Sequence, residues 1–136
     1  MKILAIPASS SQSSINRQLL TYASRLIEDG LIADATVEML DLNDYEMPIF
    51  SVDREQANGI HELAQQFFDK ITAADAVIVS FAEHNGSYTA AWKNVYDWAS
   101  RIDTEVYQGK KVAMFAASPG GRAGACLLYT SDAADE

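Results

Sequence analysis

Four short apolar runs punctuate the chain, and each has the length of a β-strand. They are residues 3–6, 36–42, 76–81 and 111–117. The run AVIVSF at 76–81 is continuously apolar, which is typical of a strand buried on both faces of a sheet. The run TVEMLDL at 36–42 mixes apolar and polar residues, which places this strand nearer an edge of the sheet.

Between these runs, apolar residues recur every three or four positions, the spacing of an amphipathic helix. Such stripes extend over residues 14–29, 60–71 and 87–101, and Gly30 ends the first of them. Residues 43–57 carry no stripe and are expected to form a loop. Strand and helix thus alternate with short connections. This pattern predicts an α/β fold built as an open, doubly wound parallel sheet with helices on both faces.

The composition excludes several classes of function. With 136 residues, 49% of them hydrophobic and 21% charged, the chain has the composition of one globular domain. The net charge of −9 disfavours nucleic acid and anionic membrane surfaces as partners, because both require clustered Lys and Arg. Cys126 is the one cysteine, so we expect neither a disulfide within the chain nor a cysteine-based metal site. The sequence contains no run long enough for a membrane span and no signal peptide, so we expect a cytoplasmic protein.

The end of the chain differs from the rest. CLLYTSDAADE, residues 126–136, has neither the alternation of a strand nor the length of a covering helix. A doubly wound sheet normally continues with another helix and a fifth strand. We therefore expect one incomplete domain over residues 1–125, truncated at that point, followed by a foreign or disordered tail.

Three polar segments follow the first, third and fourth predicted strands. They are ASSSQSSIN at 8–16, AEHNGSY at 82–88 and SPGGRAG at 118–124. Ligands of open α/β sheets lie outside the carboxyl ends of the strands. We therefore expect these three segments to meet around a ligand.

The first segment lies between a buried strand and a helix N-terminus, where unpaired N–H groups and a partial positive charge suit phosphate. Hydroxyls of Ser9, Ser11 and Ser14, with the amide of Asn16, are candidates to complete a phosphate site. The alternative is that Ser14 only caps the helix. The segment lacks the glycine spacing of a P-loop or of a dinucleotide fingerprint, which disfavours ATP and dinucleotides.

The other two segments are open to the same two interpretations. Glu83, His84 and Asn85 are placed to hydrogen-bond the edge of a flat heterocycle, but Asn85-Gly86 is also a strong turn signal. Residues 118–121 offer backbone N–H groups without side-chain bulk, and these are suited to stabilise negative charge on a ring carbonyl. A simple turn is the alternative for this segment as well.

Together these segments resemble the NAD(P)H-dependent FMN reductases, a family of flavodoxin-like flavoproteins that includes quinone, azo-dye and chromate reductases. The resemblance covers about residues 1–125. It rests on the pattern S-x-x-x-x-S-x-N at Ser9, Ser14 and Asn16, and on the stretches LNDYEMPIF, AADAVIVSFAEHNGSY, KNVYDW and SPGGR, in that order.

The resemblance implies a flavodoxin-like sheet of order 2-1-3-4, lacking the family's fifth strand and last helix. It also implies FMN bound across the three segments and a homodimer or homotetramer. The residues expected to contact FMN are Ser9, Ser11, Ser14, Ile15 and Asn16 of the first segment, Ala82, Glu83, His84, Asn85 and Gly86 of the second, and Ser118, Pro119, Gly120 and Gly121 of the third.

The chain departs from the family's pattern in two of these segments. Ala8 and Ser11 stand where many members have a glycine and an arginine, and loss of the arginine removes a charge-assisted bond to the phosphate. Ala82 and His84 stand where members often have the proline and tyrosine of Pro-Glu-Tyr-Asn. We therefore expect FMN to be held less tightly than in members that keep the arginine.

The resemblance implies hydride transfer from NADPH or NADH to FMN, followed by reduction of a small acceptor such as a quinone or an azo compound. The flavin carries this chemistry, and we expect no catalytic side chain and no metal. Residues 43–57 and the region of Tyr88 are expected to border the substrate pocket. Two alternatives stay open: a flavodoxin-type electron carrier that does not react with NAD(P)H, and a non-functional fragment of the reductase.

Overall fold

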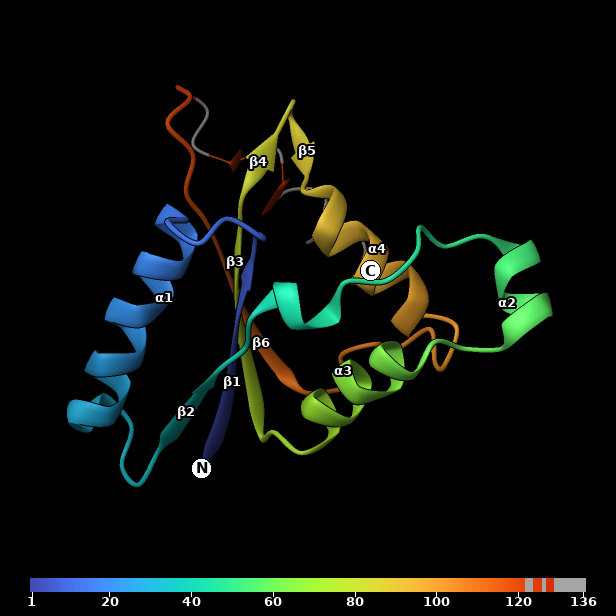
Figure 1. The fold of residues 1–136 in the computed structure, drawn as a ribbon. Coiled ribbons are helices and arrows are strands. Elements are labelled where there is room, and N and C mark those ends of the chain that lie inside the picture. The colour runs from blue at the N-terminus through green and yellow to red at the C-terminus, as the bar shows by residue number, and fades with distance from the viewer. Residues whose placement is uncertain (122–123, 126, 129–136) are drawn as a thin grey trace.

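A computed structural model describes residues 1–121, 124–125 and 127–128, and shows a parallel sheet between two layers of helices (Figure 1). The four strands of the sheet are β1 (Lys2–Ala8), β2 (Thr36–Met39), β3 (Ala76–Phe81) and β6 (Lys111–Ala116). Their order is β2-β1-β3-β6, with every neighbouring pair parallel. The predicted α/β class and the predicted order of the four strands are confirmed.

The burial of each strand follows its place in the sheet. All six residues of β3 are buried, as the continuous apolar run predicts. Strand β2 lies at one edge, and none of its residues is fully buried. It is shorter than predicted, because the chain leaves the sheet after Met39 and the backbone of Asp41 begins a new turn of helix.

The helices divide between the two faces of the sheet (Figure 1). Helix α1 (Ile15–Leu26) covers one face and runs into a π-helical turn (Ile27–Leu31). Helices α3 (Glu62–Thr72) and α4 (Ala90–Ala99) cover the other. The predicted helix at 87–101 begins later than expected, since a small antiparallel hairpin of β4 (Glu83–His84) and β5 (Ser87–Tyr88) precedes it.

The expected loop at 43–57 is wrong in part. It holds a 3₁₀ turn, Leu42–Tyr45, and helix α2, Val52–Asn58. Each begins at a side-chain cap: the Asp41 carboxylate accepts from the N–H of Asn43, and the Ser51 hydroxyl accepts from the N–H of Arg54. Helix α2 buries none of its residues, which is why no apolar stripe marks it in the sequence.

Two hydrophobic clusters lie on the two faces of the sheet. Under α1 the fully buried residues are aliphatic, among them Ile3, Leu20 and Ile78. Under α3 and α4 a larger cluster contains aromatic rings, including Phe67 and Phe81. The sheet is therefore packed far more extensively on the α3–α4 face.

The last described residues join the larger cluster. Leu127 is 2% exposed and packs with the residues under α4. Residues 129–136 lie outside the described residues, so a foreign or disordered tail stays a prediction, as does the domain boundary at 125. In the described part of the chain, no helix is long and apolar enough to cross a membrane.

Candidate functional site

The strand register brings the three predicted segments to one edge of the sheet. The last residue of β1, Ala8, pairs with Phe81, the last residue of β3. Phe81 in turn pairs with Ala116, the last residue of β6. The segments that follow these three strands therefore start side by side, at the edge where open α/β sheets bind ligands.

In the first segment, the serines divide into inward and outward groups. The hydroxyls of buried Ser9 and Ser14 accept hydrogen bonds from the N–H groups of Ser11 (3.2 Å) and Asn16 (3.2 Å). Ser14 is thus a helix cap, while its role beside a phosphate stays a prediction. Residues 10–13 are exposed, as is Ile15.

Several backbone donors of this segment point to no protein group. Within the described residues, the N–H groups of Gln12, Ser13 and Ile15 have no hydrogen-bond acceptor. They lie at the N-terminal end of α1, where the helix dipole adds a partial positive charge. Unpaired N–H groups at a helix N-terminus are the kind of donors that bind an anion such as phosphate.

Asn16 has a different role from that of the exposed serines. Its side chain is 1% exposed and makes three hydrogen bonds to the sheet. The amide nitrogen donates to the carbonyl of Ala117 (3.0 Å), while the amide oxygen accepts from the Ala117 N–H (2.9 Å) and from the Ser80 hydroxyl (2.7 Å). Asn16 therefore ties the start of α1 to the end of β6 and holds the first and third segments together.

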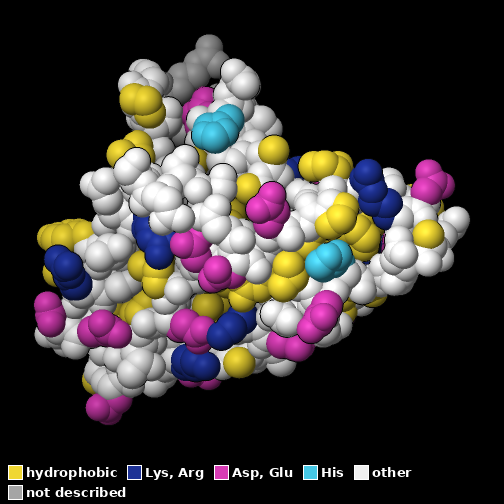
Figure 2. All heavy atoms as spheres, in the orientation of Figure 1, with side chains coloured by type: hydrophobic (Ala, Val, Ile, Leu, Met, Phe, Trp, Pro, Cys, Tyr) yellow, Lys and Arg dark blue, Asp and Glu magenta, His cyan; other side chains and the backbone are white. Residues whose placement is uncertain are grey.

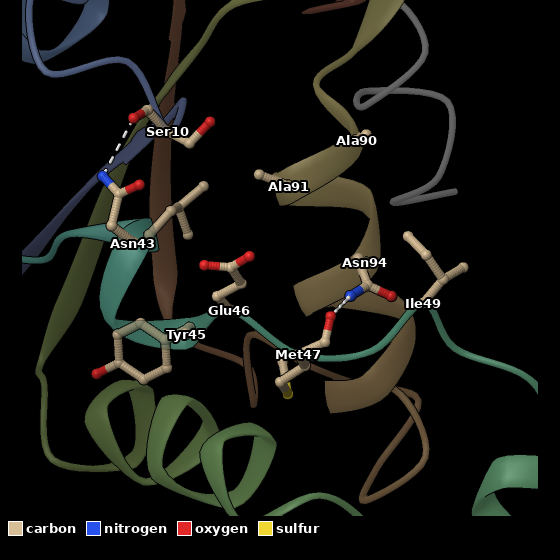
Figure 3. A pocket seen from close by; sticks show the side chains of 10 residues that line it. Ser10, Asn43, Tyr45, Glu46, Met47, Ile49, Ala90, Ala91 and Asn94 are labelled. Atoms are coloured by element: carbon tan, nitrogen blue, oxygen red, sulfur yellow. Dashed lines mark hydrogen bonds between the residues drawn. The ribbon is translucent and has the colours of Figure 1, made fainter.

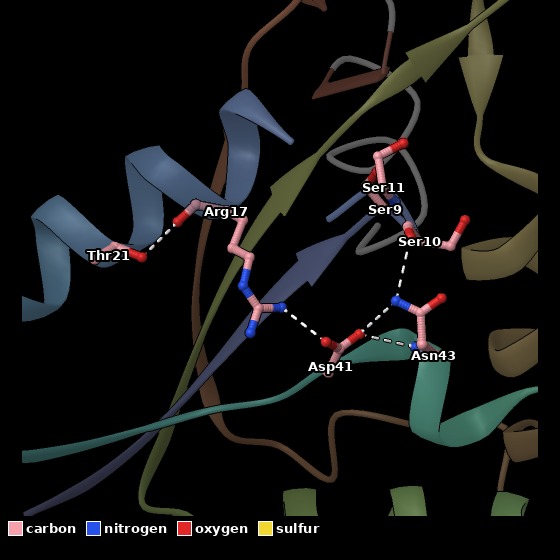
Figure 4. Close-up of polar contacts among 7 residues, drawn as sticks. All are labelled: Ser9, Ser10, Ser11, Arg17, Thr21, Asp41 and Asn43. Atoms are coloured by element: carbon pink, nitrogen blue, oxygen red, sulfur yellow. Dashed lines mark hydrogen bonds and ion pairs between the residues drawn. The ribbon is translucent and has the colours of Figure 1, made fainter. Parts of the chain in front are cut away.

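A polar network supports the first segment from the side of β2 (Figure 4). The Arg17 guanidinium pairs with Asp41 at 3.1 Å, and the side-chain amide of Asn43 donates to both Asp41 (2.8 Å) and the Ser10 carbonyl (3.1 Å). Hydrogen bonds from Asn43, first from its backbone N–H, together with the nearby Arg17, lower the pKa of the Asp41 carboxyl. No local pattern indicates this network, because its members come from three separate elements.

The second segment forms the β4–β5 hairpin. Asn85 (φ 55°) and Gly86 (φ 75°) occupy the two central turn positions, both in the left-handed region, so the predicted turn is confirmed. Glu83 is half-buried, whereas His84, Asn85 and Gly86 are exposed at the tip. The hairpin rests on the body of the protein through the ring of Tyr88, 5.1 Å from the ring of Phe81.

Thr89 is a residue of this region that the sequence reading missed. It is 2% exposed, and its hydroxyl donates to the carbonyl of Ala8 at 3.0 Å. The same hydroxyl accepts from the N–H of Trp92, which caps α4. Thr89 thus connects the start of the first segment to the end of the second, and a threonine three residues before Trp92 was a readable N-cap signal.

The third segment is the most open of the three. Its first residue, Ser118, is half-buried, whereas Ala82, the first residue of the second segment, is buried. Pro119, Gly120 and Gly121 are exposed. The Ser118 hydroxyl accepts from the N–H of Gly120 (3.2 Å), which turns the backbone, so the predicted turn is present here too.

Residues 46–50 form a wall beside the first segment and are held by α4. The side-chain amide of Asn94 donates to the carbonyls of Met47 (3.0 Å) and Pro48 (3.2 Å) and accepts from the N–H of Phe50 (2.8 Å). The indole N–H of Trp98 donates to the Pro48 carbonyl at 2.8 Å. The KNVYDW stretch therefore fixes the wall.

A hollow of about 310 Å³ opens between this wall, the first segment and the start of α4 (Figure 3). The residues that line it are Ser10, Leu42, Asn43, Tyr45, Glu46, Met47, Ile49, Ala90, Ala91 and Asn94. Residues of the 43–57 region thus line a hollow, and their role as the border of a substrate pocket stays a prediction. Tyr88 is not among the lining residues.

A parallel sheet of order β2-β1-β3-β6 between two layers of helices, with three polar segments at its carboxyl edge, defines the flavodoxin-like fold. The sequence profile of NADPH-dependent FMN reductases matches residues 1–131. The chain belongs to the NADPH-dependent FMN reductase family.

Curated relatives agree with this assignment. The chain is 32% identical over 120 residues to an NAD(P)H-dependent FMN reductase of Pseudomonas aeruginosa, a match that covers 88% of this chain and 61% of the relative. It is 31% identical over 120 residues to an NAD(P)H:quinone oxidoreductase of Solanum tuberosum, covering 88% of this chain and 60% of the relative. The chain thus spans about three fifths of the length of these relatives.

Solved structures show the same fold. FerB, a flavoenzyme NAD(P)H:(acceptor) oxidoreductase of Paracoccus denitrificans, superposes with a TM-score of 0.74 at 26% identity, covering 96% of this chain and 69% of FerB. The azoreductase AzrA superposes with a TM-score of 0.71 at 19% identity, covering 97% of this chain and 79% of AzrA, a likeness of fold alone.

Proposed function

We propose that this chain carries the FMN site of an NAD(P)H-dependent flavin oxidoreductase. FMN held in this site would supply hydride acceptance from NAD(P)H and two-electron transfer to a small acceptor. The observation that carries the proposal is the set of unpartnered N–H groups of Gln12, Ser13 and Ile15, beside two further open segments at the same edge of the sheet.

The first segment fits a phosphate group. The free N–H groups and the exposed Ser11 hydroxyl supply donors, and the α1 dipole adds partial positive charge. Ser9 and Ser14 shape the segment from inside through their own hydrogen bonds. We assign Asn16 a positioning role, because its amide already bonds to Ala117 and Ser80.

The second and third segments fit the flavin ring. The exposed hairpin residues His84, Asn85 and Gly86, with Glu83 and Ala82 behind them, would border one side of it. The N–H of Gly121, which has no acceptor among the described residues, would face the polar edge of the ring, where negative charge develops on reduction. Pro119 and Gly120 would complete this border.

Titration with FMN tests the binding site, with flavin fluorescence and melting temperature as readouts. Saturable binding that raises the melting temperature is expected, followed by oxidation of NADPH or NADH when a quinone or an azo dye is added. A protein that binds FMN without oxidising either nicotinamide would instead be a flavodoxin-type carrier. A folded protein that does not bind FMN would be a non-functional fragment.

Ser11→Arg sharpens this test, because it restores the charge that many family members carry. We expect the variant to bind FMN about tenfold more tightly, through a charge-assisted bond to the phosphate. Gln18→Arg is the matched control, since it adds the same charge on the exposed side of α1. Equal gains in both variants would mean that net charge alone sets the affinity, and would count against a phosphate at Ser11.

We further propose that the protein is a homodimer or homotetramer in the cytoplasm, where NAD(P)H is available. Helix α2 stands away from the sheet, and hydrophobic side chains gather on the surface around it (Figures 1 and 2). Ile49, Val52 and Ile60 are 65%, 55% and 40% exposed, as expected for residues that a second copy covers. Light scattering should give a multiple of the chain mass, reduced to the single mass by Val52→Asp.

A further inference from the structure

The hollow beside the first segment has a defined shape and a defined charge. Its volume of about 310 Å³ lies at the lower end of the range for small-ligand pockets. Leu42, Met47, Ile49 and two alanines of α4 give it apolar walls. The side-chain amide of Asn94 forms hydrogen bonds with the backbone of residues 46–50, so it holds the wall of the hollow in place and does not bind a ligand.

Glu46 is the only charged side chain among the described residues that line the hollow. Its carboxylate projects into the space between Ser10 and Ala91 (Figure 3), and no described residue forms a hydrogen bond or ion pair with it. The N-terminus of α4 contributes about half a positive charge nearby. Among the lining side chains, Glu46 thus supplies one negative charge, which is partly offset by this dipole and by the Arg54 guanidinium on the carbonyl of Ile49.

The uncharged polar groups of the hollow also disfavour an anionic ligand. The side-chain amide nitrogen of Asn43 is used by Ser10 and Asp41, whereas its oxygen has no donor among the described residues. The Ser10 hydroxyl is the one free side-chain group of the lining that can donate in the direction of the hollow. Carboxylate and amide oxygens repel a ligand that carries a full negative charge more strongly than a neutral ligand that carries only carbonyl dipoles.

We propose that Glu46 sets the charge selectivity of the electron acceptor: the hollow admits neutral aromatic acceptors such as unsubstituted quinones and discriminates against sulfonated or carboxylated ones. This inference rests on the proposed reductase function. The apolar walls hold the ring system, and the Glu46 carboxylate discriminates by Coulomb repulsion, which is modest because Glu46 is exposed to solvent.

The kinetic test compares a methylnaphthoquinone with a sulfonated naphthoquinone, using FMN-loaded protein and NADPH. In a ping-pong cycle, kcat/KM for the acceptor depends on the acceptor half-reaction alone. Glu46→Gln should raise kcat/KM for the sulfonate about fivefold, or about 1 kcal/mol, and leave the neutral quinone within twofold. Asp44→Asn is the matched control: it removes the same charge from the same loop, outside the hollow, and should change both acceptors by less than twofold.

A binding test without flavin separates this inference from the proposed function. Amide chemical shifts of Ser10, Glu46 and Ala91 are followed while each naphthoquinone is added to the flavin-free protein. We expect the Kd of the sulfonate to fall about fivefold in Glu46→Gln and to stay unchanged in Asp44→Asn. Equal effects in the two variants, or shifts that spare these amides, would overturn the role of Glu46. Selective binding in a protein that never oxidises NADPH would instead leave that role intact and refute the reductase.

Discussion

The two faces of the sheet are built differently, although both are covered by amphipathic helices. The α1 face has a small aliphatic cluster that includes Leu20 and Ile27. On the α3–α4 face, rings meet edge to face, with Phe67 contacting both Tyr45 (5.6 Å between centroids) and Trp92 (6.2 Å). Stability therefore comes mainly from the α3–α4 face, whereas the free N–H groups of the candidate FMN site belong to the lightly packed α1 side.

The largest expected effect comes from cutting a cavity into each face. Phe67→Ala removes a fully buried ring with two aromatic neighbours, and should lower the free energy of unfolding by about 4 kcal/mol. Leu20→Ala, equally buried on the α1 face, should lower it by about 3 kcal/mol. Urea unfolding measures both. A larger loss for Leu20→Ala would reverse the comparison.

Asn16 of α1 and Asn94 of α4 allow the two faces of the sheet to be compared directly, because the side-chain amide of each makes three hydrogen bonds. Asn16→Ala leaves buried Ser80 and the backbone of Ala117 without partners, and should cost about 2–3 kcal/mol. Asn94→Ala should cost about 1–2 kcal/mol, since water reaches part of its site.

The two asparagine variants should also differ in FMN binding. Asn16→Ala releases the start of α1 from β6, so we expect FMN affinity to fall about tenfold by fluorescence titration. Asn94 holds the wall at 46–50 rather than the FMN segments, so the change there should stay below twofold. Equal losses of affinity would show that the site depends on overall stability rather than on Asn16.

The smallest expected effect concerns Asp41, which joins the two faces by binding Arg17 of α1 and Asn43 of the 3₁₀ turn. Hydrogen bonds from Asn43 and the charge of Arg17 hold its pKa below the usual value. The stabilisation is therefore full above the unfolded-state pKa of about 4, and is lost as the pH falls through the lower pKa of the folded protein.

Asp41→Asn tests this dependence through urea unfolding at several pH values. The variant should be less stable than the wild type by about 1 kcal/mol at pH 7, and the difference should shrink below about pH 4. Asp44→Asn, exposed in the same turn, should show a much smaller difference at neutral pH. A gap between Asp41→Asn and the wild type that persists unchanged at low pH would mean that the charge of Asp41 contributes nothing.

Local pattern was enough to predict the sheet and the position of the site. Continuous apolar runs indicated β1, β3 and β6, and the carboxyl ends of these strands located the three segments. The pattern failed where a residue's role depends on a distant partner. Asn16 forms hydrogen bonds with Ala117, 101 residues away, and no local signal indicates such a pairing. Its predicted role at a phosphate stays a prediction.

The hydrophobic pattern also failed to predict elements at the surface. Helix α2 has no buried residue, so no hydrophobic period marks it in the sequence. The hairpin at Asn85-Gly86 was readable as a turn, but its strands are two residues each, too short for any alternation to show. Elements that bury little apolar surface leave little trace in the sequence.

The hydrogen bonds between Asn16 and Ala117 also determine when, during synthesis, this part of the protein can be completed. During synthesis the start of α1 leaves the ribosome long before its partner on β6 exists, since 101 residues separate the two. At the ordinary rate of roughly 5–20 residues per second, that interval lasts about 5–20 seconds. The nascent chain therefore carries an unfinished candidate FMN site during this interval, and Asn16 gains its partner at residue 117 only when the fourth strand has been made.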